Sequence, residues 1–108
     1  MRIDPEVRKQ RTQAAFNAAA DNFDDPALSF WDLCGRRTVE LAGIRPGDRV
    51  LDVCCGAGSS ALPAAQAAGD AGSVLGVDLA ERLLELGRAK AREQGLSTVT
   101  FRRGGMTD

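Results

Sequence analysis

Two carboxylates flank a glycine-rich segment near the middle of the chain. Asp52 lies four residues before Gly56, Gly58 follows two positions later, and Asp78 comes twenty positions after Gly58. Glycines carry no Cβ, so a ligand can approach their backbone, and a helix that follows them would direct free N–H groups at that ligand. A carboxylate at the end of the next strand can accept hydrogen bonds from both hydroxyls of a ribose. The spacing therefore predicts a site for a nucleoside ligand.

Two cofactors fit this pattern. The residues from Gly56 to Ala61 match the G-x-G-x-x-A form of the dinucleotide fingerprint, which favours NAD. Asp52 favours S-adenosylmethionine, because a carboxylate within a strand is costly to bury unless it meets a cation or hydrogen-bond donors. S-adenosylmethionine carries an ammonium and a sulfonium group, whereas the pyrophosphate of NAD would be repelled. A structural role for Asp52, capping a neighbouring loop in the core, stays open.

The composition excludes several other kinds of chemistry. The chain has no histidine, which rules out histidine-dependent triads and histidine general bases. Its three cysteines, Cys34, Cys54 and Cys55, make a poor disulfide framework and contain no Cys-x-x-Cys pair, so we expect no metal site and a reducing, cytoplasmic environment. We expect Cys54 and Cys55 to be small buried hydrophobic residues.

Charge and hydropathy restrict the partners. Lysine and arginine number 14 against 15 aspartate and glutamate, a net charge of -1, which gives no field that would attract nucleic acid or anionic lipid. No window is apolar over the 18 or more residues that a membrane span needs, and the N-terminus lacks a signal-peptide core. We therefore expect a small-molecule partner, no nucleic acid and no membrane span.

The elements that would position the site alternate between short apolar strands and helices. Strands are expected at 50–54, 74–77 and 98–101, with helices at 59–68 and 81–94. This order predicts an α/β fold, a Rossmann-like doubly wound parallel sheet truncated to a right-handed βαβαβ half.

Two helices are expected before the sheet. Asp4 and Pro5 form a helix start, and a second helix would run from Ser29 to Gly43. Within it, Trp31 and three residues at helical spacing (Cys34, Thr38, Leu41) suggest a packing face, although Trp31 could instead cover a substrate pocket. We divide the chain into a helical lead-in or lid, 1–45, and a partial cofactor-binding domain, 46–108, with strands 1–3 only.

The first strand raises the question of what lies beside it. In the usual order 3-2-1 it would form a sheet edge, yet its run 50–54 is apolar and unprotected. We therefore expect that the chain is a fragment, or that another copy supplies the missing neighbour in a homo-oligomer.

Four segments resemble a known family. Residues 46–58 are similar to motif I of class I S-adenosylmethionine-dependent methyltransferases, and 74–84 are similar to motif II with its helix. The segment 101–106 resembles the one after the third strand of that family. The lead-in 16–24 resembles the start of the ubiquinone/menaquinone C-methyltransferase-like branch, so the resemblance covers the chain from about Phe16 onward.

The resemblance implies a set of cofactor-binding residues and no catalytic side chain. The set is Phe23, Asp52, Cys54, Gly56, Gly58, Asp78, Leu79, Gly105 and Met106. By position, the two loop glycines would line the methionine part of S-adenosylmethionine, and Asp52 would lie near its amino group. Asp78 would hold the ribose hydroxyls, and Leu79 would pack on the adenine. Gly105 and Met106 fall where the adenine edge is read, while Phe23 resembles an aromatic that closes the site.

Two positions depart from the family pattern. Gly105 stands where an aspartate usually binds the adenine amine, which leaves that task to backbone groups or to Thr107 or Asp108. Cys54 stands where motif I often has glycine, which would place a thiol beside the loop.

The resemblance implies transfer of a methyl group to a small-molecule acceptor, with catalysis by positioning rather than by a general base. We expect this chain to supply the cofactor-binding half and to show little or no turnover alone. Two alternatives remain at this point: an NAD(P)-binding dehydrogenase domain and a non-catalytic nucleoside-binding fragment.

Overall fold

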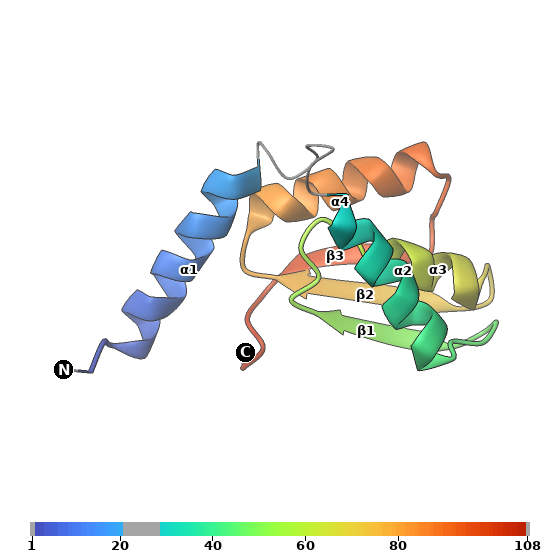
Figure 1. Ribbon diagram of the computed structural model, residues 1–108, viewed down its shortest axis with the longest axis horizontal. Coiled ribbons are helices and arrows are strands. Elements are labelled where there is room, and N and C mark those ends of the chain that lie inside the picture. Colours follow the sequence, from blue (N-terminus) through green and yellow to red (C-terminus); the bar gives the residue numbers. More distant parts are fainter. Residues whose placement is uncertain (1, 21–28, 108) are drawn as a thin grey trace.

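A computed structural model describes residues 2–20 and 29–107 of the chain (Figure 1). The elements follow one another as α1 (Pro5–Ala19), α2 (Phe30–Ala42), β1 (Arg49–Val53), α3 (Ala61–Ala68), β2 (Ser73–Asp78), α4 (Glu81–Glu93) and β3 (Val99–Arg103). The two helices before the sheet and the βαβαβ order are confirmed.

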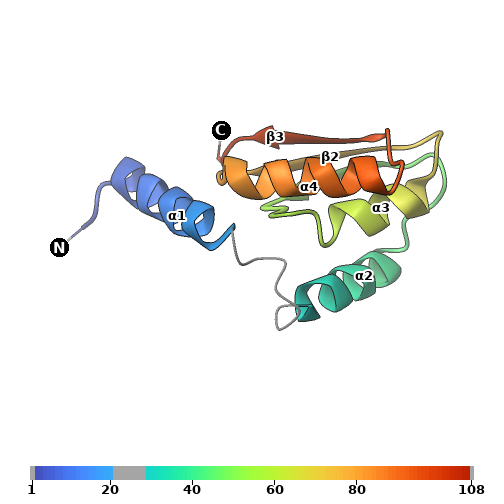
Figure 2. The same cartoon turned by 90° about the horizontal axis from the view of Figure 1, so that it is seen from above.

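The strands form one parallel sheet in the order β1-β2-β3, with Asp52 beside Gly76 and Gly76 beside Phe101. Figure 2 shows the sheet nearly edge-on, with α2, α3 and α4 all on one side of it. Side chains on the covered face are buried, as Val74 and Phe101 illustrate. The crossover helices thus cover one face, as expected for half of a doubly wound sheet.

Phe101 organises the packing beneath the glycine-rich loop. A Cβ at Gly58, Gly76 or Gly87 would lie 3.2, 3.1 or 2.9 Å from atoms of the Phe101 ring. These three glycines belong to the loop, to β2 and to α4, so the ring fills space that three separate elements leave open. The loop is therefore seated on a side chain from β3.

Local signals explain how α1 and α2 begin and end. The Asp4 carboxylate accepts hydrogen bonds from the N–H groups of Glu6 and Val7, and Pro5 occupies the first helical position, as predicted. Gly43 ends α2 in the left-handed conformation at φ 66°. Ser29 precedes α2 without a side-chain cap.

The predicted packing face of α2 is wrong. Leu41 is 72% exposed, Trp31 is 46% exposed, and Gly35 is the residue of this helix that is buried. A Cβ on Gly35 would lie 1.9 Å from the carbonyl oxygen of Ser59, so α2 rests with its backbone against the loop that precedes α3. The contact of α2 therefore involves Gly35 and the partly buried Val39, which packs against the core, and not the four residues of the predicted face.

Strand β1 lies at one edge of the sheet that the described residues form, as predicted. Its side chains Leu51 and Val53 point to the face opposite the helices and are 63% and 45% exposed. Whether a second copy covers this edge stays a prediction. Within residues 2–20 and 29–107, no helix is long and apolar enough to cross a bilayer.

Candidate functional site

A cleft of about 930 Å³ opens at the carboxyl ends of the strands. Figure 1 shows α1 standing beyond those ends, so the cleft lies between α1, the loop after β1, the end of β2 and the segment after β3. Carboxyl ends of parallel strands are where open α/β sheets bind ligands.

Most of the predicted site residues line this cleft. They are Asp52, Cys54, Gly56, Asp78, Leu79, Gly105 and Met106. Gly58 does not line it, because its missing Cβ faces Leu62 and Phe101 in the core. Phe23 lies outside the described residues.

The loop after β1 turns sharply at residues with positive φ. Cys54 has φ 59°, Gly56 has φ 56° and Gly58 has φ 94°. A non-glycine residue in this region is strained by its Cβ, which explains why β1 ends at Val53 instead of Cys54. The Cys55 N–H donates to the carbonyl of Val77 at 3.0 Å, which keeps the loop attached to β2.

The two adjacent cysteines have different environments. Cys55 is buried, as predicted, whereas Cys54 is exposed and lines the cleft, so the expectation that both are buried is wrong for Cys54. The reason is the left-handed turn at Cys54, which aims consecutive side chains apart. Burial, with the charges of Asp52 and Asp78, raises the pKa of the Cys55 thiol to about 12.

Asp78 joins the loop to the start of α4. Its Oδ2 accepts a hydrogen bond from the Gly56 N–H at 2.9 Å, and its Oδ1 accepts one from the Ala80 N–H at 2.9 Å. An ionised carboxylate can accept about four hydrogen bonds, so each oxygen keeps acceptor capacity. Asp78 can therefore hold the loop in place and still receive hydroxyl donors from a ligand.

Asp52 has a buried oxygen that lacks a partner. Among the described residues no donor reaches its Oδ2, so the capping role considered from the sequence finds no support. Burial, and then the nearby charge of Asp78, raise the pKa of Asp52. Two carboxylates at the ends of adjacent strands thus create a site that favours a positively charged donor group, which fits the ammonium group of S-adenosylmethionine.

The segment after β3 forms a further side of the cleft. Its backbone is fixed where the Gly104 N–H donates to the carbonyl of Asp78 at 3.0 Å. Gly105, Met106 and Thr107 then line the cleft, and Met106 is 75% exposed. Whether Thr107 contacts the adenine in place of an aspartate at position 105 stays a prediction, and Asp108 lies outside the described residues.

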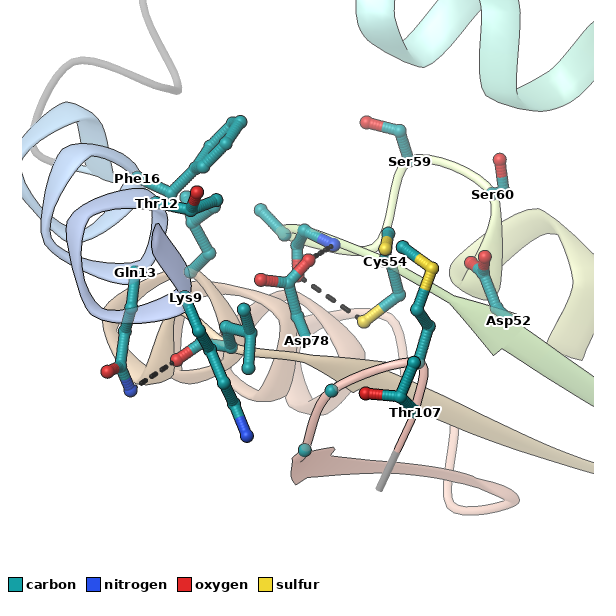
Figure 3. A pocket seen from close by; sticks show the side chains of 18 of the residues that line it. Lys9, Thr12, Gln13, Phe16, Asp52, Cys54, Ser59, Ser60, Asp78 and Thr107 are labelled. Atoms are coloured by element: carbon teal, nitrogen blue, oxygen red, sulfur yellow. Dashed lines mark hydrogen bonds between the residues drawn. The ribbon is translucent and has the colours of Figure 1, made fainter. Parts of the chain in front are cut away.

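The helix α1 supplies a wall that sequence reasoning missed. Lys9, Thr12, Gln13 and Phe16 line the cleft from this helix, and Figure 3 shows Asp78 between them and Asp52. Their spacing of three, four and seven residues follows one helical face, which is the available signal. Because most of that face is polar, a search for apolar periodicity overlooks it.

From α2, Trp31, Cys34, Gly35 and Thr38 also line the cleft. The spacing that suggested a packing face therefore marks a ligand-facing one. Asp32 reaches the loop as well, because the Ser59 hydroxyl donates to its Oδ1 at 3.1 Å.

Solved structures of S-adenosylmethionine-dependent methyltransferases are similar to this fold. A SAM-dependent methyltransferase from Aquifex aeolicus superposes with a TM-score of 0.66 and 26% identity, over 82% of this chain and 46% of that one. Geranyl diphosphate methyltransferase in complex with GPP and sinefungin gives a TM-score of 0.61 and 33% identity, over 70% of this chain and 28% of that one. Fold and cleft define a Rossmann-like methyltransferase domain.

Sequence comparison gives the family. Residues 5–107 match the model of the ubiE/COQ5 methyltransferase family, and the chain belongs to it. It is 37% identical to aklanonic acid methyltransferase DauC of Streptomyces sp. (strain C5), over 91% of this chain and 44% of that protein. It is 39% identical to nocamycin O-methyltransferase of Saccharothrix syringae, over 86% of this chain and 33% of that protein. The chain thus spans less than half the length of these relatives, and its family favours a methyltransferase over the dehydrogenase alternative.

Proposed function

We propose that this chain binds S-adenosylmethionine in the cleft and forms the cofactor-binding part of an enzyme that methylates a small molecule. The observation that carries the proposal is the pair of carboxylates at the ends of β1 and β2. Asp52 presents a buried oxygen that no donor of the described residues reaches, and Asp78 lies nearby with oxygens that can accept further hydrogen bonds.

Each end of the cofactor has residues of suitable chemistry. Asp52 would receive the methionyl amino group, and Gly56, half-buried at the cleft, would border the methionine part. Asp78 would accept from the ribose hydroxyls, while Leu79 and Met106 would contact the adenine.

The chemistry needs little acid or base from this chain. S-adenosylmethionine, when bound, supplies a methyl group activated by its positively charged sulfur. The chain's own residues would bind and orient the cofactor, and α1 and α2 line the cleft at the strand ends. Catalysis would then rest on alignment of the acceptor with the methyl group, which is a strong effect in itself. Phe16 and Trp31, half exposed at the cleft, offer apolar contacts for an acceptor.

Calorimetric titration with S-adenosylhomocysteine tests the proposal. We expect saturable binding by the wild-type chain and none with NAD. Asp52→Ala and Asp78→Ala should each weaken binding by about ten-fold or more, as loss of a hydrogen bond to a charged group does. Asp70→Ala, at an exposed turn away from the cleft, is the matched control. Binding of NAD alone, or unchanged affinity in both cleft variants of proven fold, would refute the assignment.

We also propose that two copies associate along β1. An open edge strand offers unpaired backbone groups, and the exposed Leu51 and Val53 beside it add apolar area. Light scattering should show a dimer or larger species, and Leu51→Lys should shift it toward monomer because a charge at an edge opposes pairing. A wild-type chain that is monomeric at high concentration would contradict this association.

The location that we propose is the cytoplasm. Cys34 and Cys54 are exposed and unpaired, a state that reducing compartments preserve. Fractionation of cells that express the natural gene, followed by detection of the chain, would test it; recovery in an oxidising compartment would contradict it.

A further inference from the structure

Two amide side chains, one helical turn apart, attach α1 to the wall of the cleft. The Nε2 of Gln13 donates to the carbonyl oxygen of Leu79 at 2.8 Å, and the Oδ1 of Asn17 accepts from the N–H of Arg82 at 3.2 Å. Figure 3 shows the first of these bonds, with Gln13 reaching from α1 to the backbone just beyond Asp78. Both amides are half-buried on a helix whose residues are otherwise largely exposed.

The hydrogen bond that Asn17 accepts satisfies a backbone N–H in the first turn of α4. The first N–H groups of a helix have no partner within it, and a side chain just before the helix usually accepts from one of them. At that position α4 has Ala80, which makes no side-chain bond. Asn17 supplies the acceptor from 65 residues away, so α4 is capped by α1.

The bond from Gln13 fixes the residue before that helix start. Leu79 follows Asp78, and the Asp78 carboxylate is itself bonded to the N–H groups of Gly56 and Ala80. The segment 78–82 is therefore held on one side by the glycine loop and on the other by α1. The same segment carries the groups that would contact ribose and adenine.

The two hydrogen bonds are important for the attachment of α1 because this helix buries little apolar surface against the rest of the chain. No residue of Pro5–Ala19 is buried, and Ala20, just after the helix, packs against Ala57, Ala80 and Leu83. A helix with so small an apolar contact depends on its hydrogen bonds to stay docked.

We propose that Gln13 and Asn17 are positioning residues for the adenosine end of the cofactor, an inference that rests on the proposed function. Their two bonds hold Leu79 and the start of α4 where Asp78 needs them, and they dock α1 as the opposite wall of the cleft. Without them the binding-competent arrangement is less populated, so the apparent affinity falls in proportion.

Donor and acceptor roles differ between the two amides, which gives a sharp test. Asn17 acts as an acceptor, so Asn17→Asp keeps the bond to the Arg82 N–H. Gln13 acts as a donor, so Gln13→Glu at neutral pH places a carboxylate against the Leu79 carbonyl and loses the bond. A role in helix propensity or bulk alone would not separate these two isosteric changes.

The experiment is titration of the full chain with S-adenosylhomocysteine at neutral pH. Gln13→Ala, Asn17→Ala and Gln13→Glu should each raise the dissociation constant about three- to ten-fold, the effect of one lost hydrogen bond. Asn17→Asp should remain within about two-fold of wild type. Gln10→Ala, an exposed glutamine of the same helix that does not line the cleft, is the matched control and should change nothing.

Hydrogen exchange at the Arg82 amide gives a readout that needs no ligand. Exchange should be faster in Asn17→Ala than in wild type and should return toward wild type in Asn17→Asp.

Two results would overturn the inference and leave the proposed function standing. In the first, the wild-type chain binds S-adenosylhomocysteine and Gln13→Ala and Asn17→Ala bind it with the same affinity. In the second, Asn17→Asp and Asn17→Ala have equal effects. Absence of binding by the wild-type chain would refute the proposed function and, with it, the inference.

Discussion

Replacement of Asp52 by asparagine separates two effects of its carboxyl group: a loss of stability of the folded chain and a gain in affinity for the ligand that we propose. The Oδ2 of Asp52 is buried and has no donor within residues 2–20 and 29–107, and both burial and the charge of Asp78 raise the pKa of this group. Asp52→Asn keeps the shape of the side chain, removes the charge and ends the repulsion by Asp78. We therefore expect a more stable chain that binds S-adenosylhomocysteine less well.

The gain in stability can be bounded. An unsatisfied buried polar group costs about 1–3 kcal/mol, and since Asp52 is only half-buried and asparagine keeps a polar oxygen there, we expect about 1 kcal/mol. For a chain of 108 residues this corresponds to a melting temperature higher by about 4–8 °C.

The gain in stability from Asp52→Asn should increase with pH. Because the pKa of Asp52 is higher in the folded than in the unfolded chain, the folded chain binds its proton more tightly. The destabilisation by ionised Asp52 therefore grows as the pH rises above the ordinary value of 3.8 and is fully present above the folded-state pKa. Below 3.8 both states are protonated and the gain vanishes.

Urea unfolding of wild type and Asp52→Asn at about pH 7 and about pH 4 measures this difference. Asp70→Asn, at an exposed position, serves as control and should leave stability unchanged at both values. A variant less stable than wild type at neutral pH, or a gain of equal size at both pH values, would refute the reasoning.

Three further predictions concern the loop and its neighbours. Cys54→Gly should stabilise the chain by up to about 1 kcal/mol in urea unfolding, because glycine tolerates φ 59°, whereas Cys54→Ala keeps the Cβ and should give no gain. Under native conditions at neutral pH, iodoacetamide should modify Cys34 and Cys54 but not Cys55, whose pKa of about 12 and burial keep it a protonated thiol; three adducts by mass spectrometry of the native chain would contradict this. Gly35→Ala should destabilise the chain by about 1–3 kcal/mol, since its Cβ would meet the Ser59 carbonyl at 1.9 Å, and unchanged unfolding would show that α2 is not docked there.

Local signals in the sequence predicted the βαβαβ half well. Short apolar runs for the strands and a helix with an apolar arc led to boundaries that agree with the structure within two residues. The largest shift at a helix start, at α3, reflects residues 59 and 60, which still belong to the turn. Asp52 and Asp78 were found at the cleft because consecutive parallel strands bring their carboxyl ends together.

Contacts between distant segments were not predictable in the same way. The side of α2 that faces the cleft contains Trp31 and Cys34, and apolar spacing alone could not distinguish a ligand-facing side from a packed one. The exposure of Cys54 depends on a backbone angle that residue type disfavours. The bonds from Gln13 and Asn17 join residues 66 and 65 positions apart, and neither amide belongs to a recognisable pattern.

The ring of Phe101 has a consequence for the order of folding. The residues of the glycine loop are contiguous in the sequence, yet the loop is supported by a ring 43 positions beyond Gly58, which also fits against Gly76 and Gly87. A nascent chain that has completed the loop, α3 and β2 would still lack this support. The loop side of the cleft should therefore form in the same cooperative step that docks β3, and amides of the loop should exchange hydrogen at the rate of global unfolding rather than by local opening. The part of the cleft that the loop forms is thus expected only when all three strands of the sheet are paired.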